Sequence, residues 1–186
     1  MNLRFLPTAL FLGAAITAAA QGYNLKAPLA ARPAFLTSVG QSADTEMVKV
    51  LMDRAHIPFK ADVKAKPADL AASGAKTLVL AIGGSSKGLG AAGISADAEL
   101  ERARSVIAMA RKRGMKIIGL HVGGEGRRGD LSDRFIRAAV PQCDYLIVVA
   151  GGNKDGLFNK LCGKAPMDTV DRITKAGEPL AKAFLN

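Results

Sequence analysis

Three apolar segments of this chain each end in a Gly-Gly pair, and this repeated pattern constrains the fold more than any other feature. The segments are 76–82, 116–122 and 144–150, and each pair is followed by polar residues, a cation and another glycine. A strand that is apolar throughout is typical of a parallel sheet covered on both faces. Parallel neighbours need crossover connections, which are usually helices. The pattern therefore predicts an α/β domain.

The sequence between these segments supplies the other elements. One further strand is predicted at 34–39 and a weaker one at 59–63. Predicted helices cover 44–55, a short stretch from 67, 95–113, 132–139 and 180–185, the last following a break at Gly177 and Pro179. Together they predict a single doubly wound, mostly parallel five-stranded sheet with helices on both faces, as in Rossmann and flavodoxin-like folds.

The longest predicted helix, 95–113, is amphipathic. Its buried face is predicted to hold Leu100, Ala103, Val106, Ile107 and Ala110. Its solvent face is predicted to hold Glu99, Arg102, Arg104 and Arg111. Asp44 is expected to cap the helix that follows the first strand, and Asp130 and Ser132 are expected to cap the helix near 132–139.

The first twenty residues have the pattern of a signal peptide. Arg4 precedes an apolar run over 5–16, which is shorter than the roughly 20 residues of a membrane-spanning helix. Ala18 and Ala20 supply small residues for cleavage near Ala20. We therefore expect residues 1–20 to be removed and residues 21–186 to form one exported domain, periplasmic or secreted, without stable membrane insertion. A buried N-terminal helix is the alternative, which Pro7 disfavours.

Glycine loops follow the three strong strands, and in a parallel sheet they meet at the carboxyl edge, where such folds bind ligands. Glycine lets backbone N–H groups approach an anion, and helix N-termini add positive dipole ends. The candidate ligand-binding residues are Gly83, Gly84, Ser85, Ser86, Lys87, Gly123, Gly124, Arg127, Arg128, Gly151, Gly152, Asn153 and Lys154. The loop 40–44 is expected to join them. Alternatively, the glycines serve packing and the cations face water.

The charge balance favours anionic partners. Lys and Arg number 26 against 16 Asp and Glu, a formal net charge of +10. Such a surplus attracts anions of many kinds. The chain has no Trp, two Tyr and no basic stripe interleaved with aromatics, so we expect no nucleic acid partner. If the cations scatter over the surface, the chain is instead a basic envelope protein without a discrete pocket.

Familiar catalytic motifs overlap the first loop, and each lacks its context. The G-x-G-x-x-G at 88–93 begins several residues after the strand and has no acid at the next strand end. In the P-loop spacing, Leu89 stands where lysine is required. The G-x-S-x-G around Ser86 has no acid and histidine in triad order. His121 and Glu125, with Ser86, remain the candidates for acid, base or nucleophile.

Cysteine and histidine usage is sparse. Cys143 and Cys162 are the two cysteines, and the sequence leaves open whether they form a disulfide. His56 and His121 are the two histidines, and no Cys or His cluster has ligand spacing. We therefore expect neither a metal site nor a bound cofactor.

Several segments resemble an uncharacterised exported bacterial family classed as a domain of unknown function. The resemblance lies in 90–95 with Glu99, in 121–129 with Ser132 and Asp133, and in 155–158. It implies export, a Rossmann/flavodoxin-like fold and a shared site, but no reaction.

Two hypotheses of function follow. In the first, the chain is an exported protein that binds a small carboxylate- or phosphate-type anion, with Arg127 and Arg128 as a clamp. In the second, it is a small periplasmic hydrolase or transferase that acts on an anionic substrate. Whether it is an enzyme is left open, as is its oligomeric state.

Overall fold

The computed structural model describes residues 23–185, which form one six-stranded sheet in the order β2-β1-β3-β4-β5-β6. The strands are β1 (Ala34–Val39), β2 (Phe59–Ala61), β3 (Thr77–Ile82), β4 (Lys116–His121), β5 (Tyr145–Val149) and β6 (Met167–Val170). All five neighbouring pairs are parallel. The predicted signal peptide, residues 1–20, lies outside the described residues.

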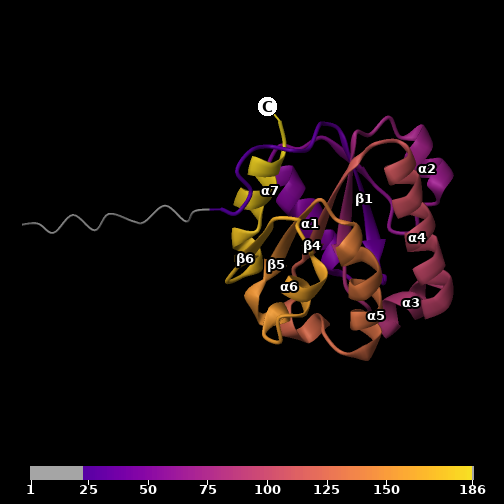
Figure 1. The fold of residues 1–186 in the computed structure, drawn as a ribbon. Helices are drawn as coiled ribbons and strands as arrows, with labels where there is room; N and C mark the ends of the chain where they lie inside the picture. Colours follow the sequence, from indigo (N-terminus) through magenta and orange to yellow (C-terminus); the bar gives the residue numbers. More distant parts are fainter. Residues whose placement is uncertain (1–22, 186) are drawn as a thin grey trace, which may run out of the picture.

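Helices cover both faces of the sheet (Figure 1). They are α1 (Asp44–Arg54), α2 (Pro67–Ala72), α3 (Ser86–Ala92), α4 (Ala96–Lys112), α5 (Asp130–Ala139), α6 (Leu157–Leu161) and α7 (Gly177–Ala183), with 3-10 turns η1 (Gly124–Arg127), η2 (Val140–Gln142), η3 (Ala150–Asn153) and η4 (Ile173–Lys175). Side chains of α1 and α7 pack on one face, and those of α2 to α6 on the other. The predicted doubly wound α/β fold is confirmed.

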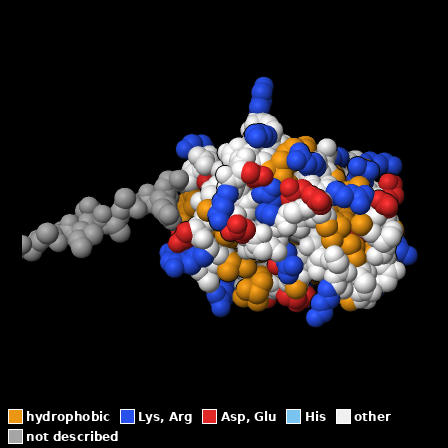
Figure 2. Space-filling model, turned by 90° about the horizontal axis from the view of Figure 1, so that it is seen from below, with side chains coloured by type: hydrophobic (Ala, Val, Ile, Leu, Met, Phe, Trp, Pro, Cys, Tyr) orange, Lys and Arg blue, Asp and Glu red, His pale blue; other side chains and the backbone are white. Residues whose placement is uncertain are grey.

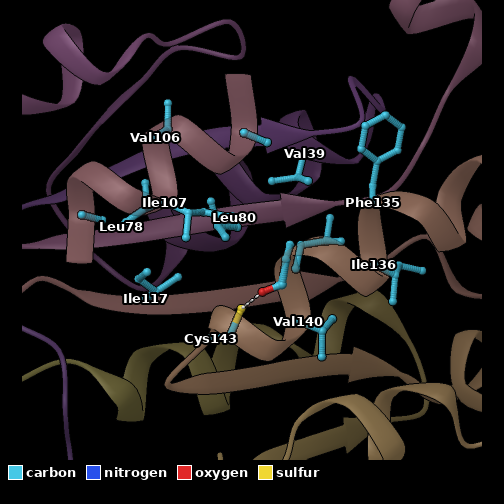
Figure 3. Packing of buried hydrophobic residues seen from close by; sticks show 14 of the residues in the cluster. Val39, Leu78, Leu80, Val106, Ile107, Ile117, Phe135, Ile136, Val140 and Cys143 are labelled. Carbon is cyan, nitrogen blue, oxygen red and sulfur yellow. Dashed lines mark hydrogen bonds between the residues drawn. The ribbon is translucent and has the colours of Figure 1, made fainter. Parts of the chain in front are cut away.

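Strand β3 explains why the strong strands are apolar throughout. Leu78, Leu80 and Ile82 enter the core under α4 and α5, whereas Val79 and Ala81 enter the core under α1 and α7. Successive side chains of a strand point to opposite faces, so a strand covered on both sides needs an apolar residue at every position. Figure 3 shows the first of these cores, in which side chains of the sheet meet those of α4 and α5.

The C-terminal part differs from prediction in two ways. The sheet has six strands and not five, because Met167–Val170 forms β6 against β5. This strand is short, and its exposed Thr169 interrupts the apolar pattern that marked the others. The predicted helix break at Gly177 and Pro179 is wrong, since α7 begins at Gly177 and Pro179 lies in its first turn. Proline is tolerated there because the first N–H groups of a helix have no intrahelical partner.

Near the two ends of the described chain, residues 29–30 lie beside residues 183–185. Leu29 and Ala30 donate backbone hydrogen bonds to the Ala183 carbonyl at 3.0 and 2.9 Å, and Leu185 donates one to the Ala30 carbonyl at 2.8 Å. Ala30 and Phe184 form a parallel bridge. Residues 23–30 therefore belong to the folded domain.

Two further findings bear on chemistry and environment. Cys143 and Cys162 are both free, and the Cys143 thiol donates to the Ala139 carbonyl inside the core (Figure 3). Among residues 23–185, no helix combines the length and the hydropathy that crossing a bilayer requires.

The strand order sets the place of the site. The chain moves from β1 outward to β2, then returns past β1 to β3 and continues in the other direction. The loops after β1 and β3 therefore diverge to opposite faces of the sheet and leave a crevice between them. Open α/β sheets bind their ligands at such a switch point.

Candidate functional site

A cleft of about 570 Å³ lies at this switch point, at the carboxyl edge of β1 and β3. Its lining comes from the loops after β1, β2, β3 and β4, namely Gln41, Ser42, Ala43, Thr45, Glu46, Val63, Ser85, Lys87, Gly88, Ala91 and Arg127. We call it the switch cleft. Figure 2 views this edge of the molecule and shows cationic and acidic side chains interspersed over it.

The loop after β1 has an unusual backbone at Gln41. Its φ is +56°, a left-handed conformation that residues other than glycine rarely adopt. The Gln41 side chain donates to the Val63 carbonyl at 2.7 Å, and its backbone forms an antiparallel bridge with Gly84. Backbone in such a conformation persists where its surroundings determine it, often at functional sites.

A buried ion pair holds the same loop from below. Glu99 of α4 is fully buried and accepts a hydrogen bond from the Gly40 N–H at 2.9 Å. Arg102 pairs with Glu99 at 2.7 Å and donates to the carbonyls of Ser38 and Ala65. The prediction that Glu99 and Arg102 face solvent is therefore wrong. Helical periodicity assigned them to the wet face, whereas the loop after β1 covers them and satisfies their hydrogen bonds.

Two cations reach the switch cleft. Lys87, in the first turn of α3, is exposed and takes part in no ion pair of the described residues. Arg127 is 31% exposed, and its Nε lies 3.2 Å from Asp44 Oδ1. No hydrogen bond of residues 23–185 uses the two terminal nitrogens of Arg127.

Asp44 does not cap α1 as predicted. The N-cap residue is Ala43, whose side chain makes no capping hydrogen bond, and the Asp44 N–H donates to Ser42 Oγ at 3.2 Å. The Asp44 carboxylate turns inward instead, because Arg127 is there to pair with it. Its second oxygen, Oδ2, is buried without a hydrogen-bond partner. Among the described side chains, Asp44 alone orients Arg127, through the hydrogen bond from Arg127 Nε.

Arg128 lies outside the cleft and is fully engaged. It donates to both carboxylate oxygens of Asp133, to both of Asp155 and to the Gly152 carbonyl, which uses all five of its N–H groups. These hydrogen bonds raise the pKa of Arg128 and lower that of Asp133. Arg128 thus connects the loop after β4 to α5 and to the loop after β5, and it has no donor free for a ligand. The structure gives no support to the expected clamp of Arg127 with Arg128.

The other predicted cation, Lys154, also has a partner. Its Nζ lies 2.5 Å from Glu125 Oε2, in an ion pair exposed on both sides. The hydrogen bond from Lys154 lowers the pKa of Glu125. Neither residue lines the switch cleft. The Asn153 side-chain oxygen accepts from the Phe158 N–H of α6 at 3.0 Å, whereas the N-cap residue of that helix is Gly156.

His121 is buried and inaccessible to a ligand. Its Nδ1 lies 3.0 Å from the Ile82 carbonyl oxygen and its Nε2 lies 3.2 Å from that of Gly124. Burial lowers the pKa of His121, although the two carbonyls favour the charged ring. Ser86 is exposed in the first turn of α3. Within the described residues, no hydrogen bond links His121, Ser86 and Glu125 to one another.

Some of the loop glycines pack closely against their surroundings. A Cβ on Gly84 would lie 2.9 Å from Ser132 N, one on Gly152 would lie 2.5 Å from the His121 ring, and one on Gly123 would overlap Arg127. By contrast, a Cβ on Gly83 or Gly151 would meet only ordinary contacts, and Gly124 has a φ of +59° that favours glycine. Packing therefore explains one glycine in each of the three Gly-Gly pairs and does not explain the other.

Asp130 and Ser132 do not cap α5 as predicted. The N-cap residue is Gly129, and neither Asp130 nor Ser132 makes a capping hydrogen bond. Ser132 Oγ accepts from the Gly84 N–H at 2.9 Å and donates to the Gly84 carbonyl at 3.2 Å. Ser132 therefore connects α5 to the loop after β3, because Gly84 lies against the start of that helix.

Five residues of the cleft lining were not among the predicted candidates. Thr45 and Glu46 lie in the first turn of α1, Val63 follows β2, and Gly88 and Ala91 lie in α3 after β3. Their position after strands was a usable signal, since every such loop lies at the carboxyl edge. What the sequence did not reveal is which strands are neighbours.

The comparisons with known proteins identify the family. Residues 31–184 match the family model described as "Domain of unknown function (DUF6305)", and the chain belongs to that family. The comparison with curated proteins found no match.

Two solved structures are similar at low scores. One is the psychrotrophic esterase EstA from Pseudoalteromonas sp., with a TM-score of 0.36 and 9% identity over 75% of this chain and 78% of that one. The other is a GDSL-like lipase from Bacteroides thetaiotaomicron VPI-5482, with a TM-score of 0.35 and 9% identity over 74% of this chain and 67% of that one. Similarity at this level carries no argument about activity.

Proposed function

We propose that this member of the DUF6305 family is an exported protein that binds a small carboxylate- or phosphate-type anion in the switch cleft. One observation carries the proposal. Lys87 and Arg127 line a cleft at the position where open parallel sheets bind ligands, and within residues 23–185 Lys87 has no ion pair and the terminal nitrogens of Arg127 make no hydrogen bond. Charge-assisted hydrogen bonds from two such groups recognise an anion strongly.

The size and lining of the cleft suit a small molecule. Its volume of about 570 Å³ lies within the range of roughly 300 to 1,000 Å³ that ligand pockets span. Gln41, Ser42 and Ser85 add polar groups to the lining, and Val63 and Ala91 offer apolar contacts. The ligand is therefore expected to carry one anionic group and a modest remainder.

The neighbouring ion pairs do not cancel this attraction. Glu46, the acidic residue of the lining, pairs with Lys49 at 3.0 Å, so it is neutralised by its own helix. Asp44 offsets part of the Arg127 charge but leaves the terminal nitrogens of Arg127 available. Lys87 has no such counter-charge among the described residues, and we expect it to contribute most to affinity.

A hydrolase or transferase acting on an anionic substrate is the alternative, and it has less support. It requires a base or nucleophile at the cleft. His121 is buried and held by two backbone carbonyls, and Glu125 pairs with Lys154 away from the lining. Ser86 is accessible, but no described side chain is placed to activate it.

A thermal-shift screen of the purified protein against small carboxylates, phosphates and nucleotides tests the proposal. A ligand at 100 times its dissociation constant adds about 2.7 kcal/mol of stability. Lys87→Ala should weaken binding about tenfold, which removes about 1.4 kcal/mol of that gain. Arg127→Ala should also weaken binding, but it leaves Asp44 unpaired and lowers stability without ligand.

The control is Lys160→Ala, which removes an exposed lysine of α6 that has no ion pair among residues 23–185. It should respond to ligand as the parent does. The proposal is wrong if no anion raises the melting temperature. It is also wrong if Lys87→Ala and Arg127→Ala respond to the ligand as strongly as the parent.

A further inference from the structure

A second group of cations lies at the opposite, amino edge of the sheet. Arg32 precedes β1, Lys76 precedes β3, Lys116 begins β4, and Arg113 is the C-cap residue of α4. The strands β1, β3 and β4 are neighbours, with Ala34 paired to Thr77 and Thr77 paired to Lys116. Neighbouring strands are about 4.8 Å apart, so these side chains start from adjacent backbone positions.

Lys76, Arg113 and Lys116 line a common cavity of about 300 Å³. The rest of its lining consists of small or apolar residues, namely Leu29, Ala31, Ala75, Gly114 and Met115. No acidic side chain lines it. We call the three lining cations together with Arg32 the amino-edge cluster.

The amino-edge cluster has no counter-charge. Within residues 23–185, no ion pair and no side-chain hydrogen bond engages any of its four members. Asp144, at the start of the neighbouring β5, is already used by Arg111 and by the Ile117 N–H, each at 2.8 Å. Arg32 Nε is moreover buried without a hydrogen-bond partner. Because an unpartnered buried donor is costly, this guanidinium favours an acceptor that the described chain does not supply.

The cations of the carboxyl edge differ from this cluster because most of them have acidic partners. There, Arg127 pairs with Asp44, Arg128 with two aspartates, and Lys154 with Glu125. The four members of the amino-edge cluster, by contrast, have no ion-pair partner among residues 23–185. Basic residues at the end of α4 are an ordinary helix preference, but that preference does not explain cations at the starts of three neighbouring strands.

The C-terminal end of α4 carries a partial negative charge that an anion at this place must overcome, but three of its last carbonyls are already paired. Gly114 and Met115 donate to the carbonyls of Arg111 and Ala110 at 3.0 and 2.9 Å, and Arg113 donates to that of Met109 at 3.1 Å. The last carbonyls of the helix are thus occupied within the turn that ends it. The charge presented to the cavity is that of the side chains.

We propose that the amino-edge cluster binds a phosphate-type group, with Lys76, Arg113 and Lys116 as its contacts and Arg32 completing the cluster. A phosphomonoester carries about −1.5 to −2 charges at neutral pH and three acceptor oxygens, which matches several converging cations better than a single carboxylate does. The group belongs either to a small soluble phosphate or to an anionic lipid headgroup. This site is independent of the switch cleft.

The first arm of the test is calorimetric titration of the purified protein with inorganic phosphate and with pyrophosphate. The second arm is co-sedimentation with vesicles of phosphatidylcholine, with and without phosphatidylglycerol. Both arms use Lys76→Ala/Lys116→Ala, which removes two exposed cluster lysines. The matched control is Lys160→Ala/Lys175→Ala, which removes two exposed, unpaired lysines elsewhere and gives the same net charge.

We expect the cluster variant to bind phosphate or the anionic vesicles about tenfold more weakly than the control variant does. The reason is that it loses two charge-assisted contacts at an exposed site. Loss in the titration identifies a soluble phosphate as the source, and loss in sedimentation alone identifies a headgroup. The proposal is overturned if neither probe binds the parent, or if both variants bind equally. It is also overturned if Lys87→Ala removes the binding that the cluster variant retains, because the phosphate then occupies the switch cleft.

Discussion

The carboxylate of Glu99 accepts a hydrogen bond at 2.9 Å from the N–H of Gly40, a residue 59 positions earlier in the chain. Through this bond, α4 fixes the first residue of the loop that forms one wall of the switch cleft. Arg102 neutralises Glu99 and joins it to the end of β1. A buried ion pair therefore determines the geometry of a surface cleft.

Glu99→Gln should lower the free energy of unfolding by about 3 kcal/mol, because removing one partner of a buried pair leaves Arg102 without its counter-charge. Urea denaturation measures the loss, and hydrogen exchange of the Gly40 amide should become faster. Glu101→Gln, on the exposed side of the same helix, is the control and should change stability by less than about 0.5 kcal/mol. Equal effects of the two substitutions would show that the Glu99 pair has no special role.

Arg128→Lys should lower stability by about 1.5 to 3 kcal/mol at neutral pH, since lysine keeps the charge but cannot donate to Asp133, Asp155 and Gly152 together. Arg128 lowers the pKa of Asp133, so this contribution is present above the unfolded value of about 3.9 and is lost as the pH falls through the folded one. The difference between parent and variant should therefore shrink in acid.

The control for Arg128 is Arg134→Lys. Arg134 pairs with Asp97 in an exposed ion pair, which contributes about 0 to 1 kcal/mol. Chemical denaturation at several pH values measures both variants. A loss at Arg134 as large as that at Arg128 would contradict the role given to Arg128.

Two glycines of α3 should respond to alanine with opposite signs. A Cβ on Gly88 would fall on the Gln41 carbonyl, so Gly88→Ala should cost about 1 to 3 kcal/mol and disturb the cleft loop. A Cβ on Gly90 would meet nothing within 4 Å, so Gly90→Ala should gain about 0.5 to 1 kcal/mol from helix propensity. Thermal unfolding distinguishes them, and a stabilising Gly88→Ala would refute the packing described here.

His121 should make stability depend on pH near neutrality. Burial lowers the folded-state pKa of His121 from 6.5, so below that value the unfolded chain binds a proton that the folded protein does not. Stability should therefore fall as the pH is lowered from about 7.5 to about 5.5. The fall should be smaller in His121→Gln, whereas His56→Asn, at the exposed second histidine, should behave as the parent does.

The alternation of strands and helices was readable from the sequence because a covered strand is apolar at every position and a helix is not. From this alternation it was possible to predict the strong strands and the loops that follow them at the carboxyl edge. It was also possible to predict that Lys87 and Arg127 lie in these loops. Strand order was not readable, since it depends on which way each crossover turns, and the switch cleft follows from that order. The strand Met167–Val170 was not predicted because its pattern is short and partly polar.

The partners of the charged residues were also beyond the sequence. Arg127 and Asp44 are 83 positions apart, and Arg128 and Asp155 are 27 apart. Nothing in the local pattern distinguishes Arg127, with terminal nitrogens free, from its neighbour Arg128, with every donor engaged. Likewise, Glu99 has the spacing of a solvent-facing residue, and only the loop that covers it makes it a buried one.

The bridge between Ala30 and Phe184 makes the described chain nearly circular. A short linker from Leu185 to Leu29 would close it, and the exposed turn at Gly163 would serve as a new pair of ends. Such a permuted chain should keep the sheet order, while the last strand and its helix would precede the first. The pairing of residues 29–30 with 183–185 thus joins the first and last described segments, and it should persist when the chain is cut elsewhere.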